Sequence, residues 1–126
     1  MSAYHPNYVL LYVDQPAVSG AFYADLLNLQ AVESSPTFVL FVLPSGLKLG
    51  LWSRHTVEPK VLASGGCSEL AFPVPDRSVV NDMYADWSAR GLTIAQRPTA
   101  LDFGYTFMAL DRDGHRLRVM ALEMSA

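Results

Sequence analysis

The sequence predicts an α+β fold of two modules, each with the element order strand, helix, strand, strand, strand. Two observations predict it. Segments rich in β-branched and aromatic residues surround one apolar helical stretch in each half of the chain. The tripeptide Tyr-Ala-Asp at 23–25 in the first predicted helix also recurs at 84–86 in the second, 61 residues later. Three identical residues alone could arise by chance, but their coincidence with the same element order indicates an internal duplication.

The elements of the first half follow from local signals. Residues 8–13 (YVLLYV) form a strand, and 14–16 (Asp-Gln-Pro) supply an N-cap and an early-turn proline for a helix that runs to about residue 27. The side chains that we expect on the buried face of this helix are Val18, Ala21, Phe22 and Leu26. Further strands are predicted at about 30–34, 37–43 and 47–52, with a turn at 44–46 (Pro-Ser-Gly).

The second half repeats this order. Residues 69–74 form a strand, Asp76 caps the helix that follows, and Gly91 stands where a C-terminal glycine belongs. The apolar stripe of this helix consists of Val79, Val80, Met83, Tyr84 and Trp87. The remaining strands are expected near 92–96, 105–110 and 115–121, and the turn at 111–114 (Asp-Arg-Asp-Gly) closes the last hairpin.

Length and composition define the organisation. A chain of 126 residues suits a single domain, and 51% apolar against 17% charged residues exclude disorder. We therefore expect one domain over 1–126 built of two repeats, at about 7–53 and 68–122. A linker near 54–67, which ends in Ser-Gly-Gly, joins them.

Several classes of protein are excluded. The net charge is −3 and no basic run offers a surface for phosphates, so we expect no nucleic-acid partner. The longest apolar run, 38–43, is far shorter than the roughly 20 residues that span a bilayer. Residues 1–6 do not resemble a signal peptide, and the one cysteine, Cys67, cannot form an internal disulfide. These features predict a cytoplasmic protein without a membrane partner.

The repeated unit resembles the vicinal-oxygen-chelate superfamily of glyoxalase I, bleomycin-resistance proteins and extradiol dioxygenases. The residues that carry this resemblance are Val13, Ser19-x-x-Phe22-Tyr23 and Asp111-x-Asp113-Gly114-His115. A narrower resemblance is to the phenazine-antibiotic-resistance subgroup. It is carried by Leu51-Trp52-Ser53, Ser68-Glu69, Phe103-Gly104-x-Thr106-Phe107 and Asp113-Gly114-His115-x-x-Arg118-Val119. The superfamily implies a curved mixed-sheet cup with helices on its outer face, and the subgroup implies a homodimer that binds its drug without a metal.

Enzymes of the superfamily place His, Glu or Gln at one position in each of four strands, where they hold a divalent ion. The positions of this chain that match them are Tyr8, Gly50, Glu69 and Arg118. Only Glu69 is a good ligand for a hard cation, and a guanidinium would repel one. This departure from the family pattern predicts no metal and no cofactor, and we assign no catalytic residue.

Two roles are open for Glu69 and Arg118, which the resemblance places on the wall of the cup. They can form a salt bridge that neutralises two buried charges. Alternatively, Arg118 binds a carboxylate of the ligand and Glu69 orients it. Both roles are compatible if the pair changes partners on binding.

Alternation along the strands extends the cup wall. One face holds Tyr8, Leu10 and Tyr12, then Lys48, Gly50 and Trp52, then Arg116, Arg118 and Met120. The opposite face, which we expect under the helices, holds Val9, Leu11, Val13, Leu47, Leu49, Leu51, Leu117 and Val119. Aromatic rings, a methionine and a few charges suit a flat aromatic ligand.

The predicted ligand-binding residues are Trp52, Arg118, Glu69, Tyr8, Tyr12, Gly50, Phe103, Tyr105 and Met120. Trp52 could instead fill the rim of the cup or a dimer interface, and Gly50 could mark a bulge rather than let a ring approach the backbone. Phe103 and Tyr105 flank Gly104 and either close on a ligand or pack within their hairpin. His55 either reaches the rim or is a solvated loop residue.

The resulting hypothesis is metal-free binding of a small planar aromatic compound, with resistance to a phenazine-like or bleomycin-like antibiotic by sequestration. The alternative is a glyoxalase-like or dioxygenase-like lyase or oxidoreductase of the same superfamily. A sensor or carrier of an aromatic metabolite is a third possibility. Turnover distinguishes the enzyme, and a binding-dependent resistance phenotype separates sequestration from sensing.

Overall fold

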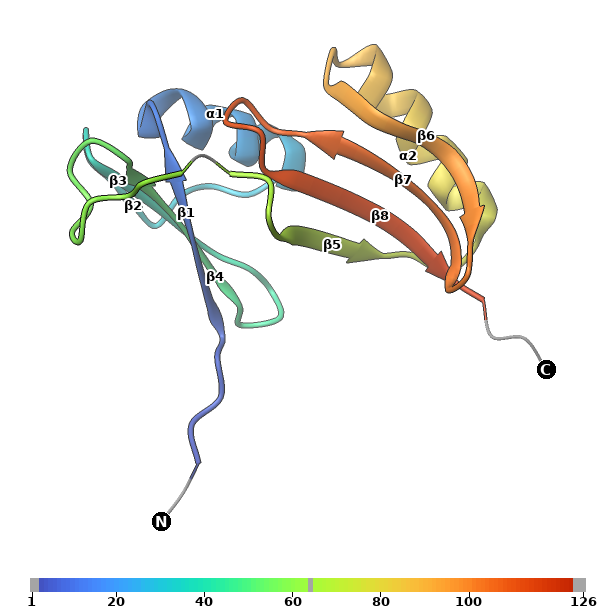
Figure 1. The fold of residues 1–126 in the computed structure, drawn as a ribbon, viewed down its shortest axis with the longest axis horizontal. Coiled ribbons are helices and arrows are strands. Elements are labelled where there is room, and N and C mark those ends of the chain that lie inside the picture. Colours follow the sequence, from blue (N-terminus) through green and yellow to red (C-terminus); the bar gives the residue numbers. More distant parts are fainter. Residues whose placement is uncertain (1–2, 64, 124–126) are drawn as a thin grey trace. The chain divides into compact units, whose positions relative to one another are not determined.

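The computed structural model describes residues 3–63 and 65–123, which contain eight strands and two helices (Figure 1). The chain divides into two units, residues 1–64 and 65–126, and each is described by itself. Each unit has the order strand, helix, strand, strand, strand, as the duplication predicts.

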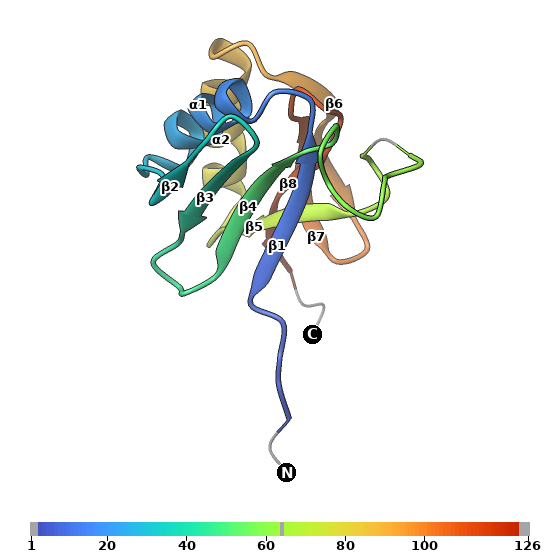
Figure 2. The ribbon, with the colours of Figure 1, turned by 90° about the vertical axis from the view of Figure 1, so that its left-hand side faces the viewer.

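The first unit is one mixed sheet with one helix. Its elements are β1 (Tyr8–Val13), α1 (Pro16–Leu27), β2 (Glu33–Ser34), β3 (Phe38–Val42) and β4 (Lys48–Ser53). The strand order is β1-β4-β3-β2, with β1 parallel to β4 and the other neighbours antiparallel. Helix α1 packs against β3 and β4 (Figure 2). The parallel pairing follows because α1 carries the chain back over one face of the sheet between β1 and the β2–β4 meander.

The register of this sheet sets side chains in rows across β1, β4 and β3. The rows on one face are Tyr8, Lys48, Val42; then Leu10, Gly50, Leu40; then Tyr12, Trp52, Phe38. On the other face Leu11, Val13, Leu49 and Leu51 are buried, as alternation predicts. The packed core of the unit therefore lies between the sheet and α1.

Helix α1 corrects two expectations. Its buried residues are Pro16, Ser19, Gly20 and Tyr23. Of the residues predicted on the buried face, Val18 and Ala21 are exposed, and Phe22 and Leu26 are only half-buried. The helix is apolar nearly all round, and small residues let it approach β3 closely: a Cβ on Gly20 would lie 3.2 Å from Val39. The position of the cap is the second correction. The N-cap residue is Gln15, whose side chain makes no capping hydrogen bond, and one oxygen of the Asp14 carboxylate contacts His55.

The second unit has the same plan. Its elements are β5 (Glu69–Pro73), α2 (Arg77–Ala89), β6 (Thr93–Leu101), β7 (Gly104–Leu110) and β8 (Arg116–Leu122). The strand order is β5-β8-β7-β6, with β5 parallel to β8 and antiparallel neighbours elsewhere. Helix α2 packs against β6, β7 and β8. Its Trp87 ring meets Phe72 and Phe107 edge to face, so the predicted stripe faces the core.

The ends of α2 match the prediction closely. The Asp76 carboxylate accepts a hydrogen bond from the Val79 amide at 3.1 Å, which satisfies one orphan donor of the first turn. Gly91 follows the helix with φ at +85°, a conformation in which glycine carries no Cβ penalty. In the last hairpin, Asp111 accepts from the amides of Asp113 and His115, so this acidic turn is accounted for by its own backbone.

Strand β6 is longer than expected. The sequence predicts it at about 92–96, but the strand runs from Thr93 to Leu101 and includes Pro98. Proline is tolerated because β6 is an edge strand, and the pairing with β7 shifts register between Gln96 and Thr99. The strand thereby brings Gln96 into the neighbourhood of the β7 and β8 side chains described below.

These two units confirm the α+β class and the two β-α-β-β-β modules. The predicted curved cup with helices on its outer face involves both units together, and it stays a prediction. No helix in the described part of the chain is long and apolar enough to cross a membrane.

Candidate functional site

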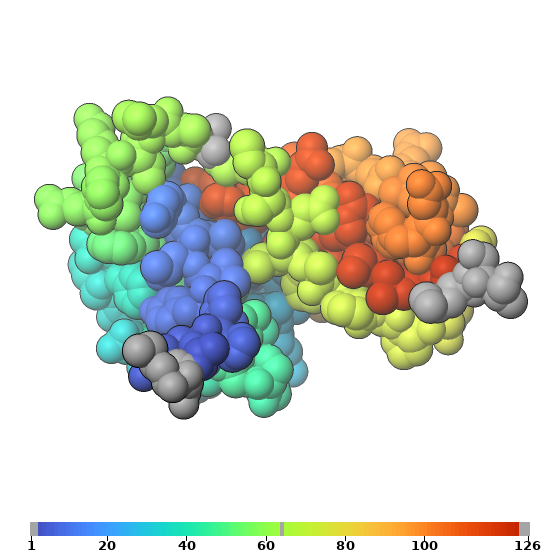
Figure 3. All heavy atoms as spheres, turned by 60° about the horizontal axis from the view of Figure 1, so that its bottom comes forward, coloured from blue at the N-terminus to red at the C-terminus, as the bar shows by residue number. Residues whose placement is uncertain are grey.

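An apolar hollow of about 520 Å³ opens on the sheet face of the first unit that does not carry α1. We name it the aromatic hollow, and its lining consists of Tyr8, Leu10, Phe38 and Trp52. Tyr8 and Leu10 remain 41% and 43% exposed, although both are large apolar residues. Residues of β1 are visible at the surface in blue in Figure 3. Exposed apolar surface gathered around a hollow is typical of a binding site.

Trp52 is held at one end of this hollow by two other rings. Its ring centroid lies 6.4 Å from that of Tyr12 and 6.5 Å from that of Phe38, with interplanar angles of 77° and 90°. Edge-to-face contacts of this kind fix the orientation of an indole. Tyr8 and Trp52, both predicted ligand contacts, thus line one hollow, and the Tyr12 ring contacts Trp52 next to it.

Gly50 has a different role from the predicted ones. It is buried, and a Cβ at this position would lie 2.7 Å from Leu10 and 2.9 Å from Phe38. The ring that packs on the Gly50 backbone is therefore that of Phe38 and not that of a ligand. Leu10 and Phe38 together cover Gly50 and form the floor of the aromatic hollow. The alternative of a bulge was wrong, because the pairing of β4 with β1 and β3 is continuous here.

Lys48 lies at the other end of the same face of β4. Its Nζ is 5.9 Å from the centre of the Tyr8 ring, within the range of a cation–π contact. Lys48 makes no ion pair among the described residues. The sheet face that bears the hollow thus has the Trp52 indole near one end of β4 and the Lys48 ammonium group, beside Tyr8, near the other.

The second unit holds a polar cluster around Arg118, which we name the guanidinium cluster; its members are Arg118, Glu69, Gln96, Thr106 and Phe103. Arg118 Nε and Nη2 donate to the two Glu69 carboxylate oxygens at 2.7 and 2.9 Å. Nη1 donates to Thr106 Oγ1 at 3.1 Å and to Gln96 Oε1 at 3.4 Å, and the guanidinium lies 5.8 Å from the Phe103 ring centre. The hydrogen bond from Arg118 lowers the pKa of Glu69 below its ordinary value.

Thr106 anchors the cluster from below. It is fully buried, and its hydroxyl donates to the Val119 carbonyl at 2.8 Å, which leaves a lone pair directed at Arg118. Because a buried hydroxyl with both roles satisfied has little freedom, Thr106 fixes the guanidinium more firmly than an exposed partner would. Of the two roles open for Glu69 and Arg118, the structure shows the salt bridge.

Tyr105 lies on the other face of the second sheet. Its hydroxyl donates to Asn81 of α2 at 3.0 Å, and the Arg77 guanidinium lies 4.7 Å from its ring. The structure therefore does not bring Tyr105 together with Arg118 and Phe103. Met120 is half-buried and in register with Thr106, on the face that carries Arg118.

Sequence reasoning missed three residues of these two surfaces. Phe38 could have been found from the alternation along its strand and the short turn at 44–46, which set it opposite Trp52. Thr106 alternates with the core residue Phe107 and could have been assigned the same way. Gln96 had no usable signal, because its position depends on the irregular register of β6.

The four positions that match the family's metal ligands do not fit a divalent ion. Gly50 has no side chain and is covered, both Glu69 oxygens are bound by Arg118, and Tyr8 is a phenol in an apolar hollow. In neither unit do three or more His, Cys, Asp or Glu side chains of the described residues converge. No chemical step through a metal follows from these residues.

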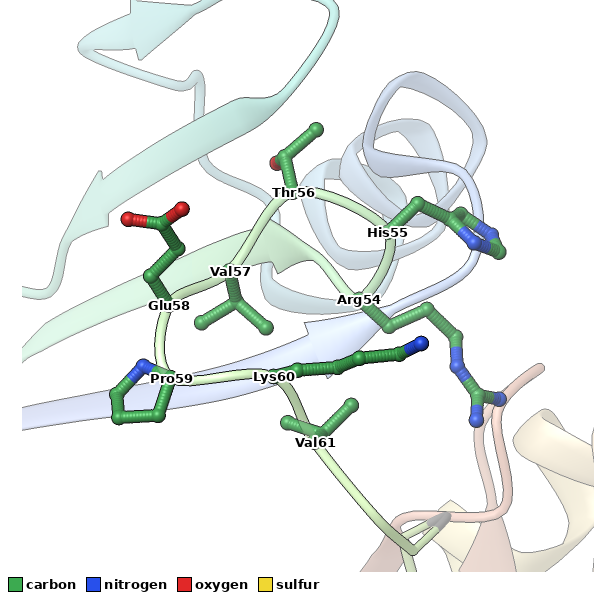
Figure 4. A pocket seen from close by; sticks show the side chains of 8 residues that line it. All are labelled: Arg54, His55, Thr56, Val57, Glu58, Pro59, Lys60 and Val61. Atoms are coloured by element: carbon green, nitrogen blue, oxygen red, sulfur yellow. The ribbon is translucent and has the colours of Figure 1, made fainter.

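A second hollow, of about 1040 Å³, lies along the loop of residues 54–61 (Figure 4). His55 Nε2 lies 2.6 Å from Asp14 Oδ1, although both side chains are exposed, and buried Val57 anchors the loop. The side chains of Arg54, His55 and Lys60 project to one side of the loop, away from Glu58. His55 is thus a partnered loop residue, on neither of the two surfaces above.

The family model of the Glyoxalase/Bleomycin resistance protein/Dioxygenase superfamily matches residues 5–119. The chain belongs to this superfamily, which confirms the resemblance that its sequence predicts. The phenazine antibiotic resistance protein EhpR of Enterobacter agglomerans is 27% identical over 121 residues, which are 94% of this chain and 92% of that protein.

Solved structures support the fold. The solution NMR structure of protein ATC0852 from Agrobacterium tumefaciens is 53% identical and has a TM-score of 0.90, with 97% of this chain and 100% of that chain covered. A crystal structure of a glyoxalase/bleomycin resistance protein/dioxygenase from Nocardioides has a TM-score of 0.82 at 19% identity, with 100% and 88% covered. At that identity the likeness shows the fold alone.

Proposed function

We propose that this protein binds a small planar aromatic compound without a metal and confers antibiotic resistance by sequestering it. The observation that carries this proposal is the aromatic hollow, where Trp52 and Tyr8 form walls over a floor of Leu10 and Phe38. A flat ring buried against such side chains gains area burial and about 0.5–1.5 kcal/mol from each aromatic contact.

Two further observations support binding rather than catalysis. Of the positions that the family uses for a metal, only Glu69 carries a good ligand, and Arg118 binds both of its carboxylate oxygens. The relative EhpR is by its name a phenazine antibiotic resistance protein, and it aligns over nearly the whole chain. We therefore propose a phenazine-like ligand as the first choice and a bleomycin-like drug as the second.

The test is a titration of the purified protein with phenazine and other flat aromatic compounds, followed by tryptophan fluorescence and by equilibrium dialysis. Dialysis is needed because Trp52→Ala removes the reporter, whereas Trp87 is buried at 3% exposure and remains as an internal emitter. We expect saturable binding that weakens at least tenfold in Trp52→Ala and in Tyr8→Ala. The matched control is Tyr105→Phe, an aromatic change on the other face of the second sheet, which should leave binding unchanged.

Either of two results overturns the proposal. The first is no saturable binding of any flat aromatic compound. The second is chemical conversion of a bound compound, which chromatography of the ligand recovered after incubation would reveal and which would favour a lyase or oxidoreductase of the superfamily. Expression in a sensitive host should raise the inhibitory concentration of the drug in proportion to the amount of protein, as stoichiometric binding requires.

The homodimer and the cytoplasmic location stay part of the proposal. A homodimer implies that light scattering of the purified protein gives twice the mass of the 126-residue chain. A monomer would restrict the ligand site to residues of one chain.

A further inference from the structure

The sheet face around the aromatic hollow carries one cation, Lys48, among the described residues of β1 to β4. Its neighbours on this face are Tyr8 and Val42 in its own row and Leu10, Gly50 and Leu40 in the next. The carboxylate on this face belongs to Glu33 of β2, which is in register with Leu40 of β3. Strand β2 is two strands away from β4. Strands lie about 4.8 Å apart, so this carboxylate is about 10 Å from the Lys48 strand.

The other cation that the sequence suggests for an acidic ligand is already neutralised. Arg118 uses Nε, Nη1 and Nη2 in four hydrogen bonds, two of them to the Glu69 carboxylate. Its side chain is only 14% exposed. A ligand carboxylate that approached the pair would meet no net charge and would have to displace Glu69, whereas Lys48 is exposed and has no carboxylate partner among the described residues.

Lys48 and Trp52 stand at the two ends of one ligand-sized surface. They are four residues apart on β4 and share its face, so their Cα atoms are about 13 Å apart. The floor of Leu10 and Phe38 lies between them and covers Gly50. A flat ligand that stacks on Trp52 and lies along β4 brings its far edge to the Tyr8–Lys48 end, where the flexible lysine stem can follow it.

We propose that Lys48 binds an acidic substituent of the ligand, and that the ligand class is therefore planar aromatic carboxylic acids. This inference rests on the proposed function, because it assigns one end of the same hollow. The aromatic walls supply most of the affinity, and the ammonium group discriminates between an ionised acid and a neutral analogue. Such a charge-assisted contact at a partly exposed site is worth about a tenfold preference.

The experiment compares phenazine-2-carboxylate with phenazine-2-carboxamide at pH 7.5, by fluorescence titration and equilibrium dialysis. The two ligands share the same rings and differ in charge. We expect the wild-type protein to prefer the acid about tenfold and to lose part of this preference in high salt. Lys48→Met should bring the ratio to about one with the amide affinity kept within about twofold, and Lys48→Arg should keep most of the preference. Arg118→Met is the matched control and should retain it.

Equal binding of acid and amide by the wild-type protein would overturn the inference and leave the proposed function standing. A preference that survives in Lys48→Met but disappears in Arg118→Met would also overturn it, and would assign the carboxylate to Arg118. Failure of both compounds to bind would instead refute the proposed function for phenazines, and this inference with it.

Discussion

Arg118 and Glu69 form a bidentate ion pair that runs diagonally across β5 and β8. The Cα partner of Glu69 is Arg116, but the Glu69 carboxylate reaches past it to Arg118 at 2.7 and 2.9 Å. Arg118 is the better partner because Thr106 and Gln96 already hold its guanidinium, whereas Arg116 is exposed. Both oxygens of Glu69 are thereby engaged, which is why a site built on this carboxylate would first have to break the pair.

Replacement of Glu69 by Gln should lower the free energy of unfolding by about 1 kcal/mol at pH 7, because the exchange leaves Arg118 with a neutral acceptor. The pKa of Glu69 is lowered from 4.5 in the folded protein, chiefly by the Arg118 hydrogen bond. The unfolded chain therefore binds the proton first as the pH falls. The stabilisation is complete well above pH 4.5 and is lost as the pH falls through the lower folded pKa.

Urea denaturation of wild type and Glu69→Gln at pH 7, 5 and 3 measures this difference. It should be largest at pH 7 and should shrink as the pH falls below 4.5, because the lowered folded pKa of Glu69 is then approached. Glu33→Gln is the matched control, because Glu33 makes no ion pair among the described residues, and it should change stability little at any of these pH values. A difference that stayed constant from pH 7 to pH 3 would show that the charge on Glu69 contributes nothing.

Gly50→Ala tests the floor of the aromatic hollow. The added methyl would lie 2.7 Å from Leu10 and 2.9 Å from Phe38, so both side chains must move. We expect a loss of about 1–3 kcal/mol in the free energy of unfolding from this overpacking, and weaker binding of any ligand that occupies the hollow.

A double-mutant cycle with Leu10→Ala isolates that contact. Because Leu10→Ala removes the nearest obstructing atoms, the double variant should be more stable than the sum of the two single effects predicts, by at least about 0.5 kcal/mol. Strict additivity in urea denaturation would mean that Leu10 does not cover Gly50 in solution.

The fold was predictable because its signals are local and periodic. Asp76, Gly91 and the apolar stripe of α2 each mark that helix, and the structure confirms all three. Helix α1 shows the limit. It is apolar on nearly every side, so periodicity could not choose between the predicted face and the one that includes Gly20 and Tyr23.

The sequence predicted which residues of the candidate site share a face of a sheet, but it could not predict the contacts that these residues make. Alternation placed Tyr8 and Trp52 on the same side of the first sheet, and the structure gives both to one hollow. It could not place Gln96, which depends on a register shift beside a proline, or show that Glu69 pairs with Arg118 rather than with its register partner. Which of two arginines pairs with Glu69 depends on the side chains packed around each of them, and strand alternation does not specify those side chains.

The Asp76 cap gives a further prediction about stability. Its pKa is lowered by hydrogen bonds from Ser78 and from the Val79 amide, so the ionised form stabilises the start of α2. Asp76→Ala should lower the thermal midpoint by a few degrees at pH 7, and this effect should fade as the pH falls below 3.8. Gln15→Ala at the start of α1 is the control. Because the Gln15 side chain makes no capping bond, an equal loss there would contradict the cap assignment.

Substitutions of two glycines in the last hairpin, Gly104 and Gly114, distinguish the cost of backbone strain from the cost of a steric clash. Gly104 and Gly114 have φ values of +149° and +83°, so both favour glycine. Their surroundings differ: a Cβ on Gly114 would meet nothing within 4 Å, whereas one on Gly104 would lie against the Ala121 carbonyl oxygen and the Glu123 amide of the neighbouring chain segment. Backbone cannot rotate away as a side chain can.

We therefore expect Gly114→Ala to cost about 1 kcal/mol, the ordinary penalty of a left-handed residue with a side chain. Gly104→Ala should cost several times more or prevent folding, because it must separate β7 from the end of β8, where the Glu123 amide donates to the Phe103 carbonyl at 2.9 Å. Urea denaturation followed by circular dichroism, with the yield of soluble protein for each variant, measures both. Equal costs at the two positions would mean that β7 does not begin in direct backbone contact with β8, and Phe103 would then lose the support that sets it beside Arg118.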